Sequence, residues 1–182
     1  MKKNTFKILF LILLIGNSVI AQENNSTATY GKTLNLGIGA GYYGYLPVLH
    51  ANYEIDVAKN FTLAPFIGFY TYNNHTVNNS GVTFNYHETA VPIGLKGMYY
   101  FDELLKVKPN WDLYLGVSAG FAIINSNWDT GYTGNKEGFN GANPLFVNLH
   151  IGSEYHFNNS IGAFLDLSNG LSTIGFAIHT NN

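Results

Sequence analysis

The chain contains no cysteine and no arginine, and it is poor in charge altogether. Without cysteine there is no disulfide framework and no thiolate site, so an exported domain must be held together by burial or by a membrane. Lysine supplies all nine basic side chains, and charged residues make up 11% of the chain, where soluble domains typically carry about a quarter. This composition makes a water-facing surface hard to build, and it offers no basic patch for nucleic acid.

Long hydrophobic runs are also scarce, and the clearest one lies at the N-terminus. Three lysines at 2, 3 and 7 surround the start of an apolar run at 8–15, which is too short to span a bilayer as a helix. We predict a signal peptide over residues 1–21, cleaved near Ala21, and a short polar tail over 22–32. A retained anchor is the alternative, but no second apolar helix follows. Removing the signal leaves six lysines against eleven acidic residues, a net charge of roughly −5.

Alternation with a period of two is abundant, and it is clearest in the hairpin over residues 143–168. In its first arm Leu145, Val147 and Leu149 point one way, while Asn148 and His150 point the other. After the turn NNS at 158–160, the same alternation resumes and continues to residue 168. A period of two is typical of a β-strand that lies between two different environments.

The same pattern predicts eight strands, which cover residues 33–43, 48–57, 61–70, 88–99, 111–123, 145–157, 161–168 and 173–179. Two long polar loops, at 73–85 and 125–143, fall at one end of an up-and-down array. The other end carries both termini, the turns at 58–60 and 158–160, and the segment 101–110, in which 102–105 can form a helical turn. Short turns at one end and long loops at the other are typical of transmembrane barrels.

The face opposite the apolar one decides which environment each face meets. A soluble barrel would need charge on its outer face, but this face is instead crowded with glycine. Small residues suit the interior of a narrow eight-stranded barrel, so we expect the apolar face to contact lipid. Aromatic residues near the strand ends, such as Tyr70 and Trp111, are typical of membrane girdles, although β-propensity favours the same residues. The predicted fold class is all-β, an eight-stranded antiparallel up-and-down transmembrane β-barrel over residues 33–180.

Three stretches carry this pattern at full length: VPIGLKGMYYF at 91–101, DLYLGVSAGF at 112–121 and HIGSEYHFNNSIGAFLDL at 150–167. With them the chain resembles the small eight-stranded outer-membrane barrels of Gram-negative bacteria, the OmpA and OmpX type of the porin family. The resemblance covers residues 32–180 and implies the fold and a location in the outer membrane. One departure is the C-terminal HTNN, because such chains often end in an aromatic residue that the insertion machinery reads.

The inward face collects the titratable side chains of the strands. We expect a network of hydrogen bonds and ion pairs in the lumen, in which Lys96 pairs with Glu88, Glu154 or Asp166, because buried charges need partners. The excess of carboxylates also allows a path for cations or protons, although narrow barrels are usually filled by their own side chains. The inward residues are His50, Glu54, Asp56, Glu88, Lys96, Asp112, His150, Glu154, His156, Asp166 and His179.

Neither a metal site nor a catalytic site is expected from the spacing of these residues. His150, Glu154 and His156 lie on one strand, so the outer two are separated from the first by about 13 and 20 Å, too far to share one ion without neighbouring strands. Neither Ser118 nor Ser153 stands in a recognisable arrangement with a base. We therefore predict a protein that is not an enzyme and has no cofactor.

The loops are the expected contact surface. Trp128, Tyr132 and Phe139 lie in the predicted loop 125–143 and are candidates for contact with a partner. The predicted function is an outer-membrane barrel with a structural or surface-interaction role, in contact with membrane lipid and possible surface partners but not with nucleic acid. The alternatives are a small passive pore, or a secreted lipocalin-like barrel with its apolar face turned inward around a ligand.

Overall fold

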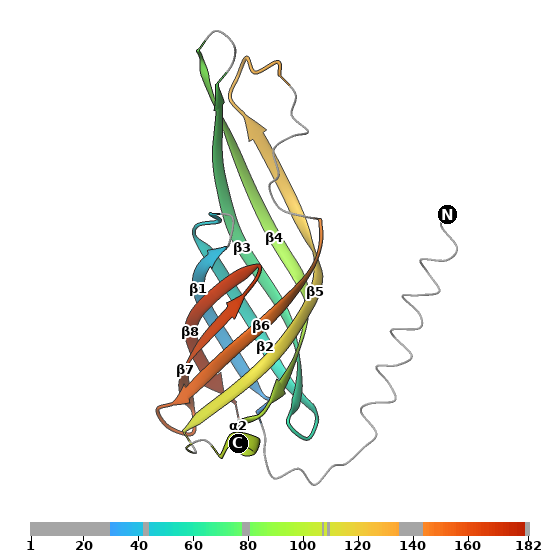
Figure 1. The fold of residues 1–182 in the computed structure, drawn as a ribbon, viewed down its shortest axis with the longest axis vertical. Coiled ribbons are helices and arrows are strands. Elements are labelled where there is room, and N and C mark those ends of the chain that lie inside the picture. Colours follow the sequence, from blue (N-terminus) through green and yellow to red (C-terminus); the bar gives the residue numbers. More distant parts are fainter. Residues whose placement is uncertain are drawn as a thin grey trace, which may run out of the picture.

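Eight antiparallel strands close into a barrel in the computed structural model, which describes residues 30–41, 44–77, 81–106, 108, 110–134 and 144–180 (Figure 1). Each strand pairs with its neighbours in sequence, and β1 pairs with β8 over nine residue pairs. The predicted fold class is confirmed. The elements are β1 Thr33–Gly41, β2 Val48–Ala58, β3 Phe61–Val77, β4 Thr83–Tyr100, α2 Asp102–Leu105, β5 Trp111–Trp128, β6 Leu145–His156, β7 Ile161–Ser168 and β8 Leu171–His179.

The predicted turns and the helical turn α2 are present where the sequence placed them. Lys59 and Asn60 join β2 to β3, and the predicted turn at 158–160 lies between β6 and β7. Asn60 adopts a φ of 59°, a left-handed conformation that asparagine tolerates well. Among the described residues no helix is long and apolar enough to cross a membrane. The predicted signal peptide over 1–21 lies outside the described residues.

The two faces of the barrel wall differ as predicted. Large apolar side chains point outward: Ile38 is 63% exposed, Leu149 65% and Phe176 61%. Charged side chains point into the lumen, where Glu54 and Asp166 are 2% and 3% exposed. This arrangement is the reverse of a soluble barrel, so the lipocalin-like alternative is wrong.

Glycine allows the strands to approach closely at the seam where the barrel closes. Gly37 of β1 lies directly opposite Gly175 of β8. A Cβ atom added at Gly175 would lie 2.0 Å from the carbonyl oxygen of Leu36, which belongs to the backbone and cannot rotate away. The same relation recurs between β4 and β5, where Gly94 faces Gly120. Glycine at these paired positions is therefore required by backbone contact as well as by the narrow lumen.

Strands β3, β4 and β5 are longer than predicted, and they project beyond the other strands (Figure 1). The predicted loop 73–85 is mostly a paired hairpin, with register from Thr71↔Thr89 to Val77↔Thr83. Likewise β5 extends to Trp128, which pairs with Tyr86, so the predicted loop boundary at 125 was wrong. The alternation of apolar residues ends where both faces of a strand meet water, but backbone pairing continues. We call residues 71–77, 83–89 and 124–128 the projecting sheet.

The seam glycine gives a testable prediction. Gly175→Ala should destabilise the barrel by about 1–3 kcal/mol, the usual cost of overpacking, because the new methyl group meets the backbone of β1. The free energy of unfolding is measured by urea titration of the detergent-folded protein, with the difference in gel mobility between unboiled and boiled samples as the readout. Gly97→Ala is the matched control, because its new Cβ would meet only side chains, the nearest being Phe61 at 3.1 Å. Equal stability of the two variants would contradict a backbone clash at the seam.

Candidate functional site

The centre of the lumen holds one ion pair with a set of hydrogen bonds around it. Lys96 of β4 pairs with Asp166 of β7, and their side chains are 4% and 5% exposed. Asp166 also accepts a hydrogen bond from the Tyr114 hydroxyl at 2.6 Å and contacts Nδ1 of His150 at 2.7 Å. The Lys96 ammonium lies 4.7 Å from the centroid of the Tyr114 ring. Of the three acids that the sequence offered as partners of Lys96, the structure selects Asp166.

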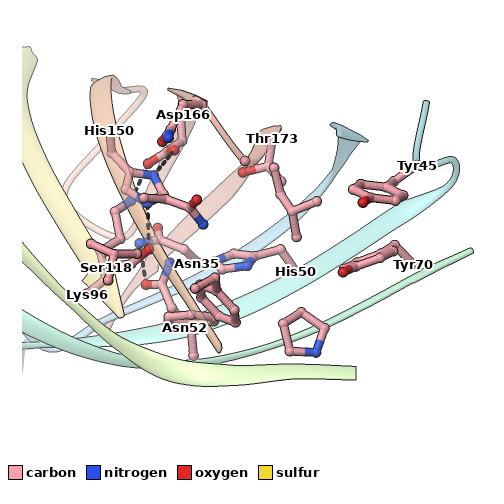
Figure 2. Close-up of a pocket in the computed structure, with 18 of the residues that line it drawn as sticks. Asn35, Tyr45, His50, Asn52, Tyr70, Lys96, Ser118, His150, Asp166 and Thr173 are labelled. Carbon is pink, nitrogen blue, oxygen red and sulfur yellow. Dashed lines mark hydrogen bonds and ion pairs between the residues drawn. The ribbon is translucent and has the colours of Figure 1, made fainter. Parts of the chain in front are cut away.

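Ser118 extends this group into a chain of three residues on three neighbouring strands (Figure 2). Its hydroxyl lies 2.8 Å from Nε2 of His150, whose other ring nitrogen faces Asp166. The hydrogen-bonding order and the distances match those of a serine, histidine and aspartate triad. The expectation that Ser118 stands in no recognisable arrangement was therefore wrong, because β5, β6 and β7 assemble the chain across the sheet.

A second group surrounds Glu54, for which no ion pair is present among the described residues. Its carboxylate accepts hydrogen bonds from the Asn35 amide at 2.6 Å, the Tyr100 hydroxyl at 2.5 Å and the Thr62 hydroxyl at 3.2 Å. Three neutral donors thus replace the water that burial removes from the carboxylate. His50 is placed in the same region, where its Nε2 contacts the Asn52 amide at 3.1 Å.

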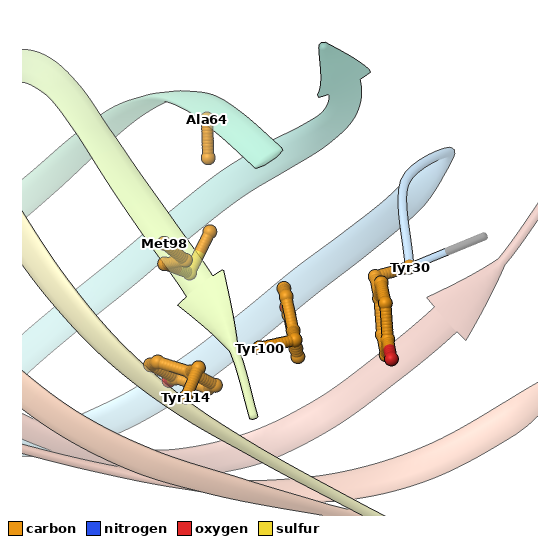
Figure 3. Close-up of a cluster of buried hydrophobic side chains, with 5 residues drawn as sticks. All are labelled: Tyr30, Ala64, Met98, Tyr100 and Tyr114. Atoms are coloured by element: carbon orange, nitrogen blue, oxygen red, sulfur yellow. The ribbon is translucent and has the colours of Figure 1, made fainter. Parts of the chain in front are cut away.

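Aromatic side chains form a buried cluster in the lumen at the end where β1 begins and β8 ends (Figure 3). Tyr30 stacks on Tyr100 with ring centroids 4.0 Å apart, and Tyr100 packs against Tyr114 at 5.5 Å. Asp56 holds Tyr30 in place by accepting a hydrogen bond from its backbone N–H at 3.1 Å. Residue 30, assigned to the tail by the sequence, is thus part of the barrel's packing. Met98, at 1% exposure, belongs to the same buried cluster.

A cavity of about 320 Å³ lies in the lumen above this packing, at the level of Lys96 and His150 (Figure 2). Its walls combine the polar groups just described with aromatic rings such as Phe66 and Tyr70. Asn35, which lines the cavity, has a side-chain oxygen with no hydrogen-bond partner among the described residues. The cavity therefore offers space, one acceptor and a cation that is already paired.

The remaining predicted lumen residues lie in other places. Glu88 sits in the outer part, where it accepts a hydrogen bond of 2.5 Å from the Tyr86 hydroxyl. At the opposite rim Asp112 contacts His156 at 2.7 Å, and Glu154 contacts His179 at 2.7 Å. The expected single network is thus divided into several groups along the barrel.

The loop candidates form part of an aromatic row on the projecting sheet. Trp128 stacks on Tyr132 with ring centroids 4.1 Å apart, and it packs against Tyr86 at 5.0 Å. Tyr132 also contacts Phe84 at 5.3 Å. Both predicted residues are half-buried rather than fully exposed, and Phe139 lies outside the described residues.

Sequence reasoning missed the tyrosines that hold the buried acids. The Tyr100 hydroxyl binds Glu54 and the Tyr114 hydroxyl binds Asp166. In the sequence these tyrosines resemble the aromatic residues that are common in any β-strand. Their inward position in the alternation was a usable signal, because a buried tyrosine hydroxyl usually finds a partner.

The central ion pair gives a prediction for stability. Lys96→Met should lower the free energy of unfolding by about 3–5 kcal/mol, the usual cost of leaving a buried partner charge uncompensated. Lys108→Met removes the same charge from an exposed position between α2 and β5 and should change stability by less than about 0.5 kcal/mol. Urea unfolding followed by tryptophan fluorescence measures both. A small effect of Lys96→Met would mean that Tyr114 and His150 suffice to hold Asp166.

Comparison with known proteins gives no family assignment. No family model matches the chain, and no curated protein does. Among solved structures, a de novo designed transmembrane β-barrel is 13% identical, with 84% of this chain and 98% of that chain covered and a TM-score of 0.47. The Yersinia pestis outer membrane protein Ail, solved in a phospholipid bilayer nanodisc, is 9% identical over 80% and 96%, with a TM-score of 0.42. Neisserial surface protein A is 14% identical over 81% and 93%, with a TM-score of 0.41.

Proposed function

We propose that the chain is an integral outer-membrane β-barrel that presents the projecting sheet at the cell surface as a site of contact. The observation that carries this proposal is the distribution of side chains, with an apolar exterior and charges buried in the lumen. Such an exterior is stable in lipid and unstable in water. Closure of the sheet leaves no open strand edge at the depth of the bilayer.

The projecting sheet has the properties of a contact surface. One edge of β3 pairs with β4 and the other faces β2. Past Thr71, which accepts a hydrogen bond from Leu46, the edge on the β2 side has no partner strand in the described part of the chain. Past Ala122, which donates a hydrogen bond to Pro144, the edge of β5 on the β6 side likewise has no partner strand among the described residues. Unpaired edges are templates for an added strand. The half-buried Trp128 adds an aromatic group of the kind that is enriched in binding hot spots.

A role as an open pore receives less support from the lumen. Tyr30, Tyr100 and Tyr114 form a buried cluster in the lumen at the end where β1 begins and β8 ends. Above it, Lys96 and Asp166 neutralise each other. Conduction would require both groups to move, so we favour a surface role over transport.

Placement in the outer membrane gives a prediction with two single-cysteine variants, which the natural absence of cysteine makes free of background. Val82→Cys lies at the tip of the projecting sheet, and Asn159→Cys lies in the turn between β6 and β7. In intact cells a membrane-impermeant maleimide should label Val82→Cys, while Asn159→Cys should react only after the outer membrane is permeabilised. Labelling of Asn159→Cys in intact cells would contradict the proposed orientation, and recovery of the protein in the soluble fraction would contradict the membrane location.

We further propose that the chain Ser118, His150 and Asp166 is structural. Ser118 is 2% exposed, and the backbone N–H groups around it serve the sheet, which leaves none to form an oxyanion hole. The Lys96 ammonium also neutralises the carboxylate that would otherwise stabilise a protonated His150.

A structural role predicts that a fluorophosphonate probe will not label the folded protein. The measurement is covalent labelling of the purified barrel, with Ser118→Ala as the matched control and a serine hydrolase as positive control for the probe. Labelling that disappears in Ser118→Ala would show a reactive serine and overturn the structural role.

A further inference from the structure

Two histidines and a glutamate meet at the barrel rim near the termini, outside the groups that the proposed function uses. Nε2 of His179 lies 2.7 Å from Oε1 of Glu154, and Nδ1 of His156 lies 3.7 Å from the same oxygen. One ligand atom from each residue fits within a span of 4.8 Å. We propose that Glu154, His156 and His179 form a binding site for a divalent transition-metal ion of the zinc class.

In each imidazole the nitrogen that points away from Glu154 contacts an oxygen atom. The nitrogen that faces Glu154 is therefore left to act as a ligand. Nε2 of His156 lies 2.7 Å from Asp112, and an ionised carboxylate only accepts hydrogen bonds. This contact fixes the proton of the neutral ring on Nε2 and the lone pair on Nδ1, which faces Glu154. A carboxylate behind a histidine ligand is the usual second layer of a zinc site.

His179 is oriented in the same way by a hydroxyl group. Nδ1 of His179 lies 2.9 Å from the hydroxyl of Thr33, and that hydroxyl donates its own proton to the carbonyl oxygen of Tyr30 at 3.0 Å. The Thr33 oxygen is therefore the acceptor for the Nδ1–H of His179. Nε2 lies 2.7 Å from Glu154, on the side where the three proposed ligands meet.

A glycine on β7 creates the space in which residues of β6 and β8 meet. Glu154 and His156 lie on β6 and His179 on β8, with β7 between them. Gly162 of β7 has no side chain, and an added Cβ would lie 2.3 Å from the Glu154 oxygen that contacts both histidines. The site therefore depends on three strands, which explains why the spacing along β6 alone predicted none.

The ligand set and its access favour zinc over the hard cations. Two imidazole nitrogens and one carboxylate oxygen are typical zinc ligands, whereas calcium and magnesium prefer oxygen alone. In a tetrahedral zinc site, with bonds of about 2.0–2.1 Å, ligand atoms lie about 3.3 Å apart, so small side-chain movements complete the geometry. The His156 side chain is 25% exposed, which gives the ion a route from the solvent at the rim.

The experiment uses the detergent-folded protein without a histidine tag, treated with chelator and then titrated with zinc chloride in a calorimeter. We expect one zinc ion per chain. His156→Gln and His179→Gln should each weaken binding at least tenfold, and Asp112→Asn should weaken it about 10–100-fold as a positioning residue. Absorption spectra with cobalt(II) in place of zinc should show the bands of a low-symmetry histidine site in the natural protein and lose them in the two histidine variants.

Two further variants separate the site from other histidines and from loss of folding. His87→Gln on the projecting sheet should bind zinc as the natural protein does. Gly162→Ala keeps every ligand but displaces the Glu154 carboxylate, so it should fold, as judged by gel mobility before boiling, and bind zinc more weakly. Absence of saturable zinc binding, or equal affinity in His156→Gln, His179→Gln and the natural protein, would overturn the proposal and leave an ion-pair cluster only.

Discussion

The hydrogen-bonded seam between β1 and β8 is the constraint on which the rest of the structure depends. In lipid an unpaired backbone N–H or C=O group costs several kcal/mol, so the first and last strands must meet along their full length. They do so over nine residue pairs, and the opposed glycines Gly37 and Gly175 permit the close approach. Closure of an even number of strands also places the start of β1 and the end of β8 at the same rim, where Thr33 pairs with His179.

A closed barrel of eight strands has a narrow interior, and this determines how charge is treated there. Water cannot solvate the buried acids freely, so each needs donors from strands across the lumen or beside it. Asp166 obtains a cation and a tyrosine hydroxyl, while Glu54 obtains neutral donors alone. Long tyrosine side chains are well suited to this task, because one ring fills space and its hydroxyl reaches a carboxylate. The polar groups and the packing of the lumen are therefore one system.

Features that depend on the alternation of residues along each strand could be predicted from the sequence. The number of strands, the direction of each face and the ion pair between Lys96 and one of three acids all follow from alternation, because a strand between lipid and lumen repeats its environment every second residue. Tyr30 was missed because a residue that precedes the first strand takes no part in the periodic pattern of that strand. The length of β3 to β5 was missed because the projecting sheet has water on both sides.

Contacts across strands were the second kind of feature that sequence reasoning could not supply. Ser118, His150 and Asp166 come from three strands, and so do the residues at the rim around Gly162. Which side chains meet depends on the stagger of neighbouring strands, and a shift of two residues would keep every face while exchanging every partner. Alternation fixes the face, whereas only register fixes the neighbour.

The strands end differently at the two ends of the barrel. At the rim near the termini, titratable side chains turn inward and are held by partners on adjacent strands, so the strands can stop short. At the other end β3, β4 and β5 continue into water, where neither face can be stabilised by lipid. There Asp129 accepts hydrogen bonds from both the backbone and the side chain of Asn85, which fastens the end of β5 to β4. The aromatic rings beside it bury one another's apolar surface, whereas in the membrane-spanning part of the strands lipid covers the apolar side chains. A sheet stabilised in this way is rigid enough to present a constant surface, which a long irregular loop of the same composition would not do.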